Sequence, residues 1–225
     1  MRSERYAHLE GRGKCSNVED VLNKLSKKRP VFHSEADFQH SLAWEIHEMH
    51  PDLNITLEKR EEINGEDLYL DIFIFRNSKV CALELKYKTK RLKVTISNED
   101  YDLKDQGAQD LGRYYFCKDI EKLEKVLENL SGTGFAIFLT NDDLYWRMPP
   151  NPNTADEDFR IHEGRTIKGK LEWKEWASPG TIRGRESPIE LAGEYEIHWK
   201  DYSDLKVKNG KFRYLLVKIE RGNSV

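Results

Sequence analysis

The 225-residue chain has few cysteines and no long apolar segment. Its longest uninterrupted apolar run, Phe135 to Leu139, is far shorter than the roughly 18 residues of a membrane-spanning helix. The N-terminal residues carry charges but no apolar core, so we expect no signal peptide. Cys15, Cys81 and Cys117 are widely spaced and form no Cys-x-x-Cys motif, which argues against a disulfide framework or a zinc knuckle. We therefore expect reduced thiols in a cytoplasmic protein that does not bind membranes.

Neither sign of charge dominates, because 37 Lys and Arg residues accompany 40 Asp and Glu residues, for a formal net charge of −3. This balance does not by itself indicate a nucleic-acid partner, for which local clusters of basic residues are the relevant signal. Aromatic residues make up 11% of the chain, which is too many for a disordered protein. The composition thus predicts a folded chain with a heavily charged surface.

The spacing of apolar residues predicts a mixed α/β fold. Helices are expected where the spacing is about 3.6 residues and strands where it is two or the run is short and apolar. The predicted helices are 18–27, 33–49, 101–117 and 120–130, and the predicted strands of the core are 54–63, 68–75, 79–87 and 134–140. Ser34 is the expected N-cap of the second helix. The order of helix, three strands, helix and strand indicates a mixed sheet with helices on its faces.

Three segments follow from this pattern. Residues 1–30 form an N-terminal helical segment, residues 31–146 form the core, and residues 147–225 form a β-rich C-terminal extension. Strands are expected in the extension at 166–173 and 195–199, together with a hairpin around Asn209-Gly210. We expect the extension to pack on the central sheet, with a small separate domain as the alternative.

Three carboxylates and one lysine occupy positions that folding alone does not explain. Glu35 lies on the core-facing stripe of its helix, and Asp71 interrupts an apolar strand. Glu84 and Lys86 project from the same face of the next strand. A buried, ionised carboxylate needs a cation or hydrogen bonds, and two adjacent carboxylates repel each other. A divalent metal would resolve this conflict, and hard oxygen ligands suit Mg²⁺ or Mn²⁺.

A buried salt-bridge cluster is the structural alternative. It would explain Glu84 with Lys86 but would leave Asp71 and Glu35 without partners.

The set of Glu35, Asp71 and Glu84-Leu85-Lys86 resembles the PD-(D/E)XK nuclease superfamily. In that superfamily an acidic residue on one strand is followed by Glu-x-Lys on the next, after a helix that offers a Glu. The predicted elements also look like its restriction-endonuclease-like αβββαβ core, over residues 31–146. The chain has Leu70 before Asp71 where the motif has proline. Proline is not a metal ligand there, so the departure weakens the resemblance more than the chemistry.

The resemblance implies a metal-dependent nuclease that hydrolyses phosphodiester bonds of DNA, with RNA as the alternative. Asp71, Glu84 and the backbone carbonyl of Leu85 would hold Mg²⁺ or Mn²⁺, and Glu35 would bind through water or complete a second metal site. The metal would polarise the scissile phosphate and activate a bound water. Lys86 would position that water and offset the developing negative charge. Such an enzyme would act in restriction, mobile-element processing or repair, and the chain could form a homodimer.

Polar residues around this core are candidate supporting groups. Gln106 and Gln109 are expected beside the active site on the helix 101–117, by resemblance to branches of the superfamily that carry a Gln there. The basic candidates for contacts with nucleic acid are Lys88, Lys90, Arg91, Lys93 and Arg113.

Two other functions remain open at this point. One is a non-catalytic module on the same fold that binds nucleic acid or assembles a complex. The other is a protein-interaction adaptor built around the β-rich segment 147–225. Intact Glu35, Asp71, Glu84 and Lys86 favour the enzyme.

Overall fold

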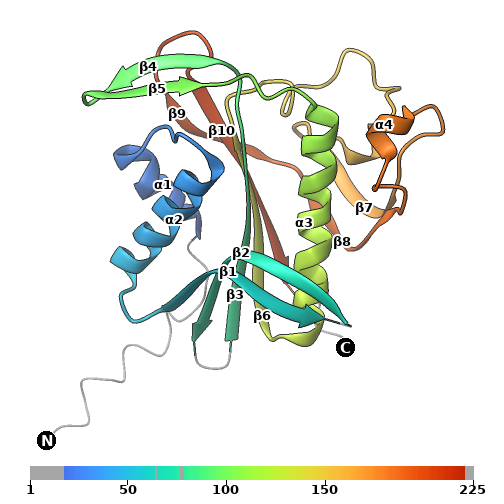
Figure 1. Cartoon of the computed structure of the whole chain (residues 1–225), viewed down its shortest axis with the longest axis horizontal. Helices are drawn as coiled ribbons and strands as arrows, with labels where there is room; N and C mark the ends of the chain where they lie inside the picture. Colours follow the sequence, from blue (N-terminus) through green and yellow to red (C-terminus); the bar gives the residue numbers. More distant parts are fainter. Residues whose placement is uncertain (1–17, 64, 77–78, 221–225) are drawn as a thin grey trace, which may run out of the picture.

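The computed structural model describes residues 18–63, 65–76 and 79–220 of the chain. A six-stranded sheet lies at its centre, in the order β1-β2-β3-β6-β10-β9 (Figure 1). Only β3 and β6 pair in parallel within it, and the other neighbours in the described chain are antiparallel. The strands are β1 (Asn54–Ile63), β2 (Glu66–Arg76), β3 (Lys79–Lys88), β6 (Gly132–Thr140), β9 (Trp199–Asp204) and β10 (Lys211–Glu220). The predicted mixed α/β fold with a mixed central sheet is therefore confirmed.

Helices cover both faces of this sheet (Figure 1). On one side lie α1 (Val18–Lys28) and α2 (Glu35–Met49), and on the other lies α3 (Gln109–Asn129). Side chains of β3 alternate between the two: Cys81, Leu83 and Leu85 pack with α1 and α2, whereas Val80 and Ala82 pack with α3. Glu84 and Lys86 continue the second set, so the alternation directs both towards α3.

The start of α2 is fixed by its predicted cap. The hydroxyl Oγ of Ser34 accepts a hydrogen bond from the backbone N–H of Asp37 at 3.1 Å. This bond satisfies one of the four free N–H groups of the first turn. Glu35 and Asp37 add negative charge at the positive end of the helix dipole. The cap therefore places Glu35 at a defined point, the first residue of α2.

The predicted helix 101–117 is wrong in its first half. Residues 92–103 form a hairpin of β4 (Leu92–Ile96) and β5 (Glu99–Leu103), and α3 begins only at Gln109 and continues without a break to Asn129. Ser97 and Asn98 both have positive φ, 51° and 69°, and connect the pair Ile96–Glu99. A two-residue turn of this kind matches the twist of a hairpin, and Asn tolerates it better than most residues.

The C-terminal segment both packs on the sheet, as predicted, and extends it with two strands. β10 pairs with β6, and β9 pairs with β10. The predicted strand 195–199 is wrong, because β8 ends at Glu196 and β9 starts at Trp199. The remaining elements are η1 (Glu157–Phe159), β7 (Thr166–Leu171), α4 (Pro179–Ile182) and β8 (Ile189–Glu196). β7 and β8 form a separate two-stranded sheet whose apolar side chains join the core around α3.

Cys81 is disulfide-bonded, so the expectation of reduced thiols is wrong for this residue. Cys117 is a free thiol whose burial raises its pKa to about 12. None of the helices in the described residues is both long and apolar enough to cross a membrane. A cytoplasmic location remains a prediction.

The close approach of β3 and β6 at Gly132 gives a prediction for stability. A Cβ at this position would lie 2.0 Å from the backbone carbonyl oxygen of Val80. Gly132→Ala should therefore lower the free energy of unfolding by about 1–3 kcal/mol, because backbone must move to admit the methyl group. Gly107→Ala is the control, since a Cβ there meets no atom within 4 Å, and it should change stability by less than about 0.5 kcal/mol. Equal denaturation midpoints for the two variants would contradict the close approach.

Candidate active site

The candidate site lies where β2 and β3 separate. Their antiparallel pairs run from Arg76–Lys79 to Ile72–Leu83. Beyond Leu83, β3 continues along β6 as far as the pair Lys88–Thr140, while β2 continues along β1. We call the region between β2 and β3 beyond the Ile72–Leu83 pair the fork. In Figure 1, α2 and α3 lie on opposite sides of the sheet that contains these strands.

Two predicted carboxylates occupy the edge of β3 in the fork. Asp71 Oδ2 accepts a hydrogen bond from the backbone N–H of Leu85 at 2.6 Å. Glu35 Oε2 accepts one from the backbone N–H of Tyr87 at 2.7 Å. Backbone N–H groups of a strand need acceptors, and here side chains from β2 and α2 supply them in place of a neighbouring strand. The structure thus brings Glu35 and Asp71 to one strand edge.

Gln39 holds the backbone of β2 at Asp71, and sequence reasoning missed it. Its Nε2 donates to the carbonyl oxygen of Asp71 and to Glu58 Oε1, both at 2.7 Å. Glu58 has φ of 50° and lies between the β1–β2 pairs Leu57–Ile72 and Lys59–Leu70, at the level of Asp71. Such a conformation costs about 1–3 kcal/mol and persists where neighbours fix it. The available signal was the spacing, because Gln39 is one helical turn after Glu35.

Glu84 and Lys86 form ion pairs with two residues of α3. Lys122 Nζ lies 2.5 Å from Glu84 Oε2, and Lys86 Nζ lies 2.6 Å from Asp119 Oδ2. Glu84 is only 1% exposed and Lys86 side chain 16%. Asp119 and Lys122 were missed by sequence reasoning. Charged residues on an otherwise buried face of a helix were the available signal.

The carboxylates of the fork outnumber its ammonium groups. Burial and, to a smaller extent, the negative charge of Asp119 raise the pKa of Asp71 to about 6, against the lowering effects of the Leu85 hydrogen bond and of Lys86. Burial, followed by the charge of Asp119, also raises the pKa of Glu84 well above its usual value. Burial lowers the pKa of Lys86, but the carboxylates of Asp119, Glu35 and Asp71 raise it more, so the net direction is upward. The fork therefore holds a charged lysine among carboxylates that resist joint ionisation.

The donor atoms of the fork fit a divalent cation in chemical type. Within the described residues no group of three or more His, Cys, Asp or Glu side chains is arranged to hold a metal ion. Oε1 of Glu84 is nevertheless buried without a hydrogen-bond partner in this part of the chain. The carbonyl oxygen of Leu85 accepts a hydrogen bond from Lys86 Nζ at 3.2 Å. Together with Asp71 these are hard oxygen donors with excess negative charge, as Mg²⁺ and Mn²⁺ require.

Gln106 and Gln109, predicted beside the active site, and Arg113, a predicted contact for nucleic acid, bind residues outside the fork. Gln106 precedes α3, and its Oε1 accepts from the N–H of Thr89 at 3.1 Å. Gln109 Nε2 donates to Asp142 Oδ2 at 2.8 Å. Arg113 is buried and its Nε donates to Asp156 Oδ2 at 2.7 Å. α3 starts later than predicted. These three residues therefore lie before or at its beginning, where they connect α3 to the ends of β3 and β6 and to the loop that follows β6.

Burial also removes Arg113 from the candidate contacts with nucleic acid. Lys90 is only partly available, since its Nζ lies 3.0 Å from Asp142 and 2.6 Å from Asp143. Lys93 is exposed on the outer side of the β4–β5 hairpin, 3.8 Å from Asp102. Lys88 is partly exposed near the end of β3, and Arg91 is exposed just before β4.

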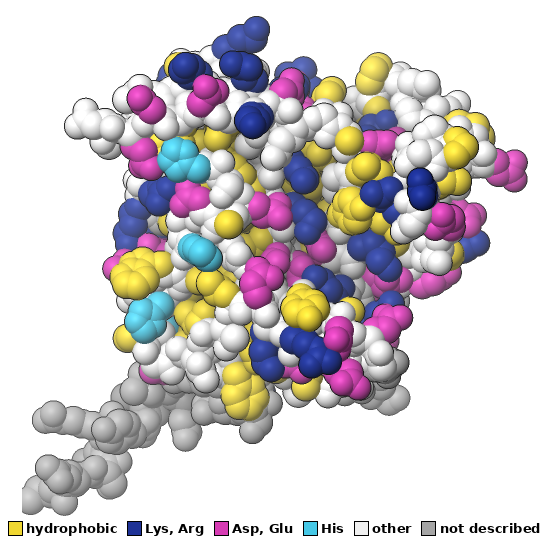
Figure 2. All heavy atoms as spheres, in the orientation of Figure 1, with side chains coloured by type: hydrophobic (Ala, Val, Ile, Leu, Met, Phe, Trp, Pro, Cys, Tyr) yellow, Lys and Arg dark blue, Asp and Glu magenta, His cyan; other side chains and the backbone are white. Residues whose placement is uncertain are grey.

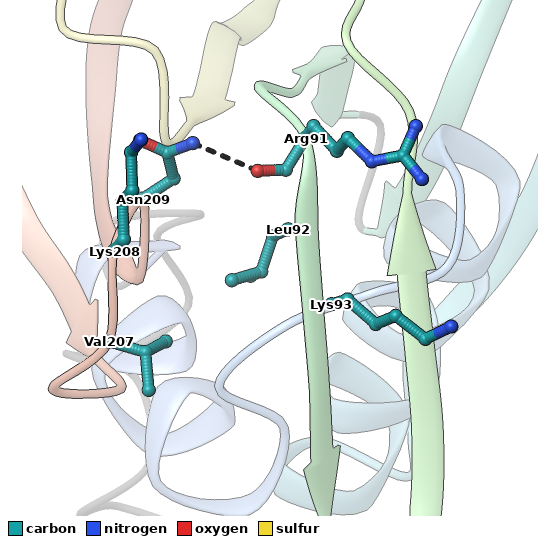
Figure 3. Close-up of a pocket in the computed structure, with 6 residues that line it drawn as sticks. All are labelled: Arg91, Leu92, Lys93, Val207, Lys208 and Asn209. Atoms are coloured by element: carbon teal, nitrogen blue, oxygen red, sulfur yellow. Dashed lines mark hydrogen bonds between the residues drawn. The ribbon is translucent and has the colours of Figure 1, made fainter.

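A shallow pocket of about 430 Å³ lies between β4 and the turn before β10 (Figure 3). The carbonyl oxygen of Arg91 accepts a hydrogen bond from Asn209 Nδ2 at 2.9 Å across it. The side chain of Leu92 points towards Val207, whereas the side chains of Arg91 and Lys93 point away (Figure 3). Lys208 also lines the pocket, which lies outside the fork.

Comparisons of the chain with protein-family models, curated proteins and solved structures find no match. The resemblance to the PD-(D/E)XK superfamily rests on the residues of the fork and on the order of the elements.

The raised pKa of Asp71 gives a prediction for stability against pH. A carboxyl with a folded pKa near 6 and an ordinary unfolded pKa binds more protons when folded, so its ionisation destabilises the protein as the pH rises from about 4 to 6. Asp71→Asn keeps an acceptor for Leu85 and removes this loss. Without metal, it should equal wild type near pH 4 and be more stable by about 1–3 kcal/mol above pH 6.

Urea unfolding at several pH values, with EDTA present, measures this difference. Asp67→Asn is the matched control, because Asp67 lies on the same strand but is exposed and pairs with Arg60. It should not reproduce the pH-dependent gain. Destabilisation of Asp71→Asn by about 3–5 kcal/mol at pH 7 would instead identify Asp71 as part of a structural ion-pair cluster.

Proposed function

We propose that the chain is a divalent-metal-dependent nuclease of the PD-(D/E)XK type, which hydrolyses phosphodiester bonds of DNA. The observation that carries this proposal is the fork, where Asp71, Glu84 and Lys86 converge with Glu35 at a strand edge. The order α2-β1-β2-β3-α3-β6 supports the finer proposal of a restriction-endonuclease-like core, because it repeats the αβββαβ order with the β4–β5 hairpin inserted.

In this proposal, Asp71, Glu84 and the carbonyl oxygen of Leu85 hold Mg²⁺ or Mn²⁺, with Glu35 at the border of the site. The metal supplies charge for the scissile phosphate and a more acidic bound water. Lys86 keeps its proton at neutral pH because its pKa is raised. It therefore acts as a hydrogen-bond donor that orients the attacking water and stabilises negative charge on the phosphorus oxygens, and it does not act as a base.

A non-catalytic module that binds nucleic acid is the second candidate. It is favoured by the ion pairs Lys122–Glu84 and Lys86–Asp119, which already neutralise much of the fork without a metal. In a nuclease these pairs must loosen when a metal and a phosphate enter. In a binding module they stay closed, and the acidic residues serve only to join α3 to the sheet.

Cleavage assays separate the two candidates. Plasmid, linear and single-stranded DNA, and RNA, are incubated with the full chain in Mg²⁺, Mn²⁺ or EDTA. We expect cleavage with metal and none with EDTA. Asp71→Asn and Glu84→Gln should each lower the rate by about 10²–10³-fold or more, whereas Asp67→Asn should not. No cleavage of any substrate by folded protein in either metal would leave the binding module as the function.

Lys86 distinguishes catalysis from binding. An interaction made only in the transition state changes the rate and not the ground-state affinity. Lys86→Ala should thus lower the cleavage rate by about 10²-fold with little change in DNA affinity measured without metal. Lys93→Ala on the exposed hairpin should do the reverse, weakening binding and reducing its salt dependence by about one counterion. If Lys86→Ala loses as much affinity as rate, Lys86 is a phosphate contact only.

A further inference from the structure

Two exposed tyrosines lie on opposite borders of the fork. Tyr69 is two residues before Asp71 on β2, and its carbonyl oxygen accepts a hydrogen bond from Lys122 Nζ at 2.8 Å, the same ammonium group that pairs with Glu84. Tyr115 is one helical turn before Asp119 on α3, so it lies on the same side of the helix. Their exposed fractions are 54% and 41%. An exposed tyrosine ring next to basic groups offers a flat surface on which a nucleic-acid base stacks.

Each of these tyrosines has an arginine beside it. Arg60 is the direct partner of Tyr69 across the β1–β2 ladder and is exposed. Arg185 comes from the loop after α4, and its Nε and terminal nitrogen donate to the hydroxyl of Tyr115 at 2.8 and 2.6 Å. Its guanidinium also lies 5.1 Å from the centre of the Tyr115 ring. Each border therefore combines an aromatic ring, on which a base can stack, with a positively charged guanidinium group, which can contact a phosphate.

The acidic and basic groups between these borders are recessed. Glu84 and Lys86 are almost covered, whereas both tyrosines are half open. Figure 2 shows acidic and basic side chains side by side in the middle of this face, between the regions of α2 and α3. A duplex is stiff over about 150 base pairs and stacks its bases inside, away from protein rings. A single strand bends into a recess and offers both faces of each base.

We infer that the fork takes single-stranded nucleic acid, with unpaired bases stacked on Tyr69 and Tyr115 on either side of the recessed groups. Arg60 and Arg185 contact the phosphates that flank the bound segment. That the phosphate between them is the one cleaved rests on the proposed nuclease function. The stacking and the preference for a single strand do not.

Binding without metal tests this inference separately from cleavage. The probes are a fluorescent oligodeoxynucleotide of about 12 nucleotides, its duplex, and an abasic strand with the same phosphates. Fluorescence anisotropy measured in EDTA should show that the single strand binds more tightly than the duplex and more tightly than the abasic strand. Tyr69→Ala and Tyr115→Ala should each weaken single-strand binding by about 5- to 100-fold, and Tyr69→Phe, which keeps the ring, should restore it.

Trp44→Ala is the matched control. Trp44 is another exposed aromatic residue, 65% open, but it lies about 140° around α2 from Gln39, which faces the fork. This variant should bind as the wild type does.

Equal affinity for the duplex or for the abasic strand would overturn the inference, as would unchanged binding in both alanine variants, even if the protein cleaves DNA. Tyrosine-dependent binding of single strands without cleavage in Mg²⁺ or Mn²⁺ would support the inference and overturn the nuclease proposal.

Discussion

The separation of β2 from β3 leaves the N–H groups of Leu85 and Tyr87 in need of acceptors, and much of the surrounding structure depends on how this need is met. Asp71 and Glu35 provide the acceptors. Because Glu35 is the first residue of α2, its bond to Tyr87 also fixes where that helix meets the sheet. Gln39, one turn later, ties the same helix to the backbone of Asp71. A single gap in strand pairing thus positions two carboxylates and one helix.

The opposite side of the fork is held by charge. Glu84 and Lys86 point towards α3, where Lys122 and Asp119 pair with them. Two buried ion pairs are an expensive way to join a helix to a sheet, because apolar side chains of similar size achieve the same with less loss of hydration. Ala82 and Val80 on the same strand do so one and two positions earlier on that face. The change from apolar to charged residues at the point where the strands separate favours a chemical role.

Residues with a strong local signal were predicted well from the sequence. The apolar alternation of β1 to β3 and the Ser34 cap depend on neighbours in the chain, and the structure confirms them. The β4–β5 hairpin was missed because it depends on left-handed Ser97 and Asn98, a pair with a weaker turn signal than Asn-Gly. Asp119 and Gln39 were missed because their partners Lys86 and Asp71 are more than 30 residues away in sequence. Such pairs are decided by packing, which one sequence does not show.

The position of β10 affects how the chain acquires its fold during synthesis. β10 is the last strand in the described part of the chain, yet it lies beside β6 in the interior of the sheet. Until residues 211–220 leave the ribosome, β6 has an unpaired edge, and unpaired edges recruit strands from other molecules. The completed sheet instead ends at β9, whose exposed Lys200 and Asp201 discourage such pairing. The sheet therefore completes its pairing only after β10 is made, and a fragment that stops at residue 146 would carry an edge prone to aggregation.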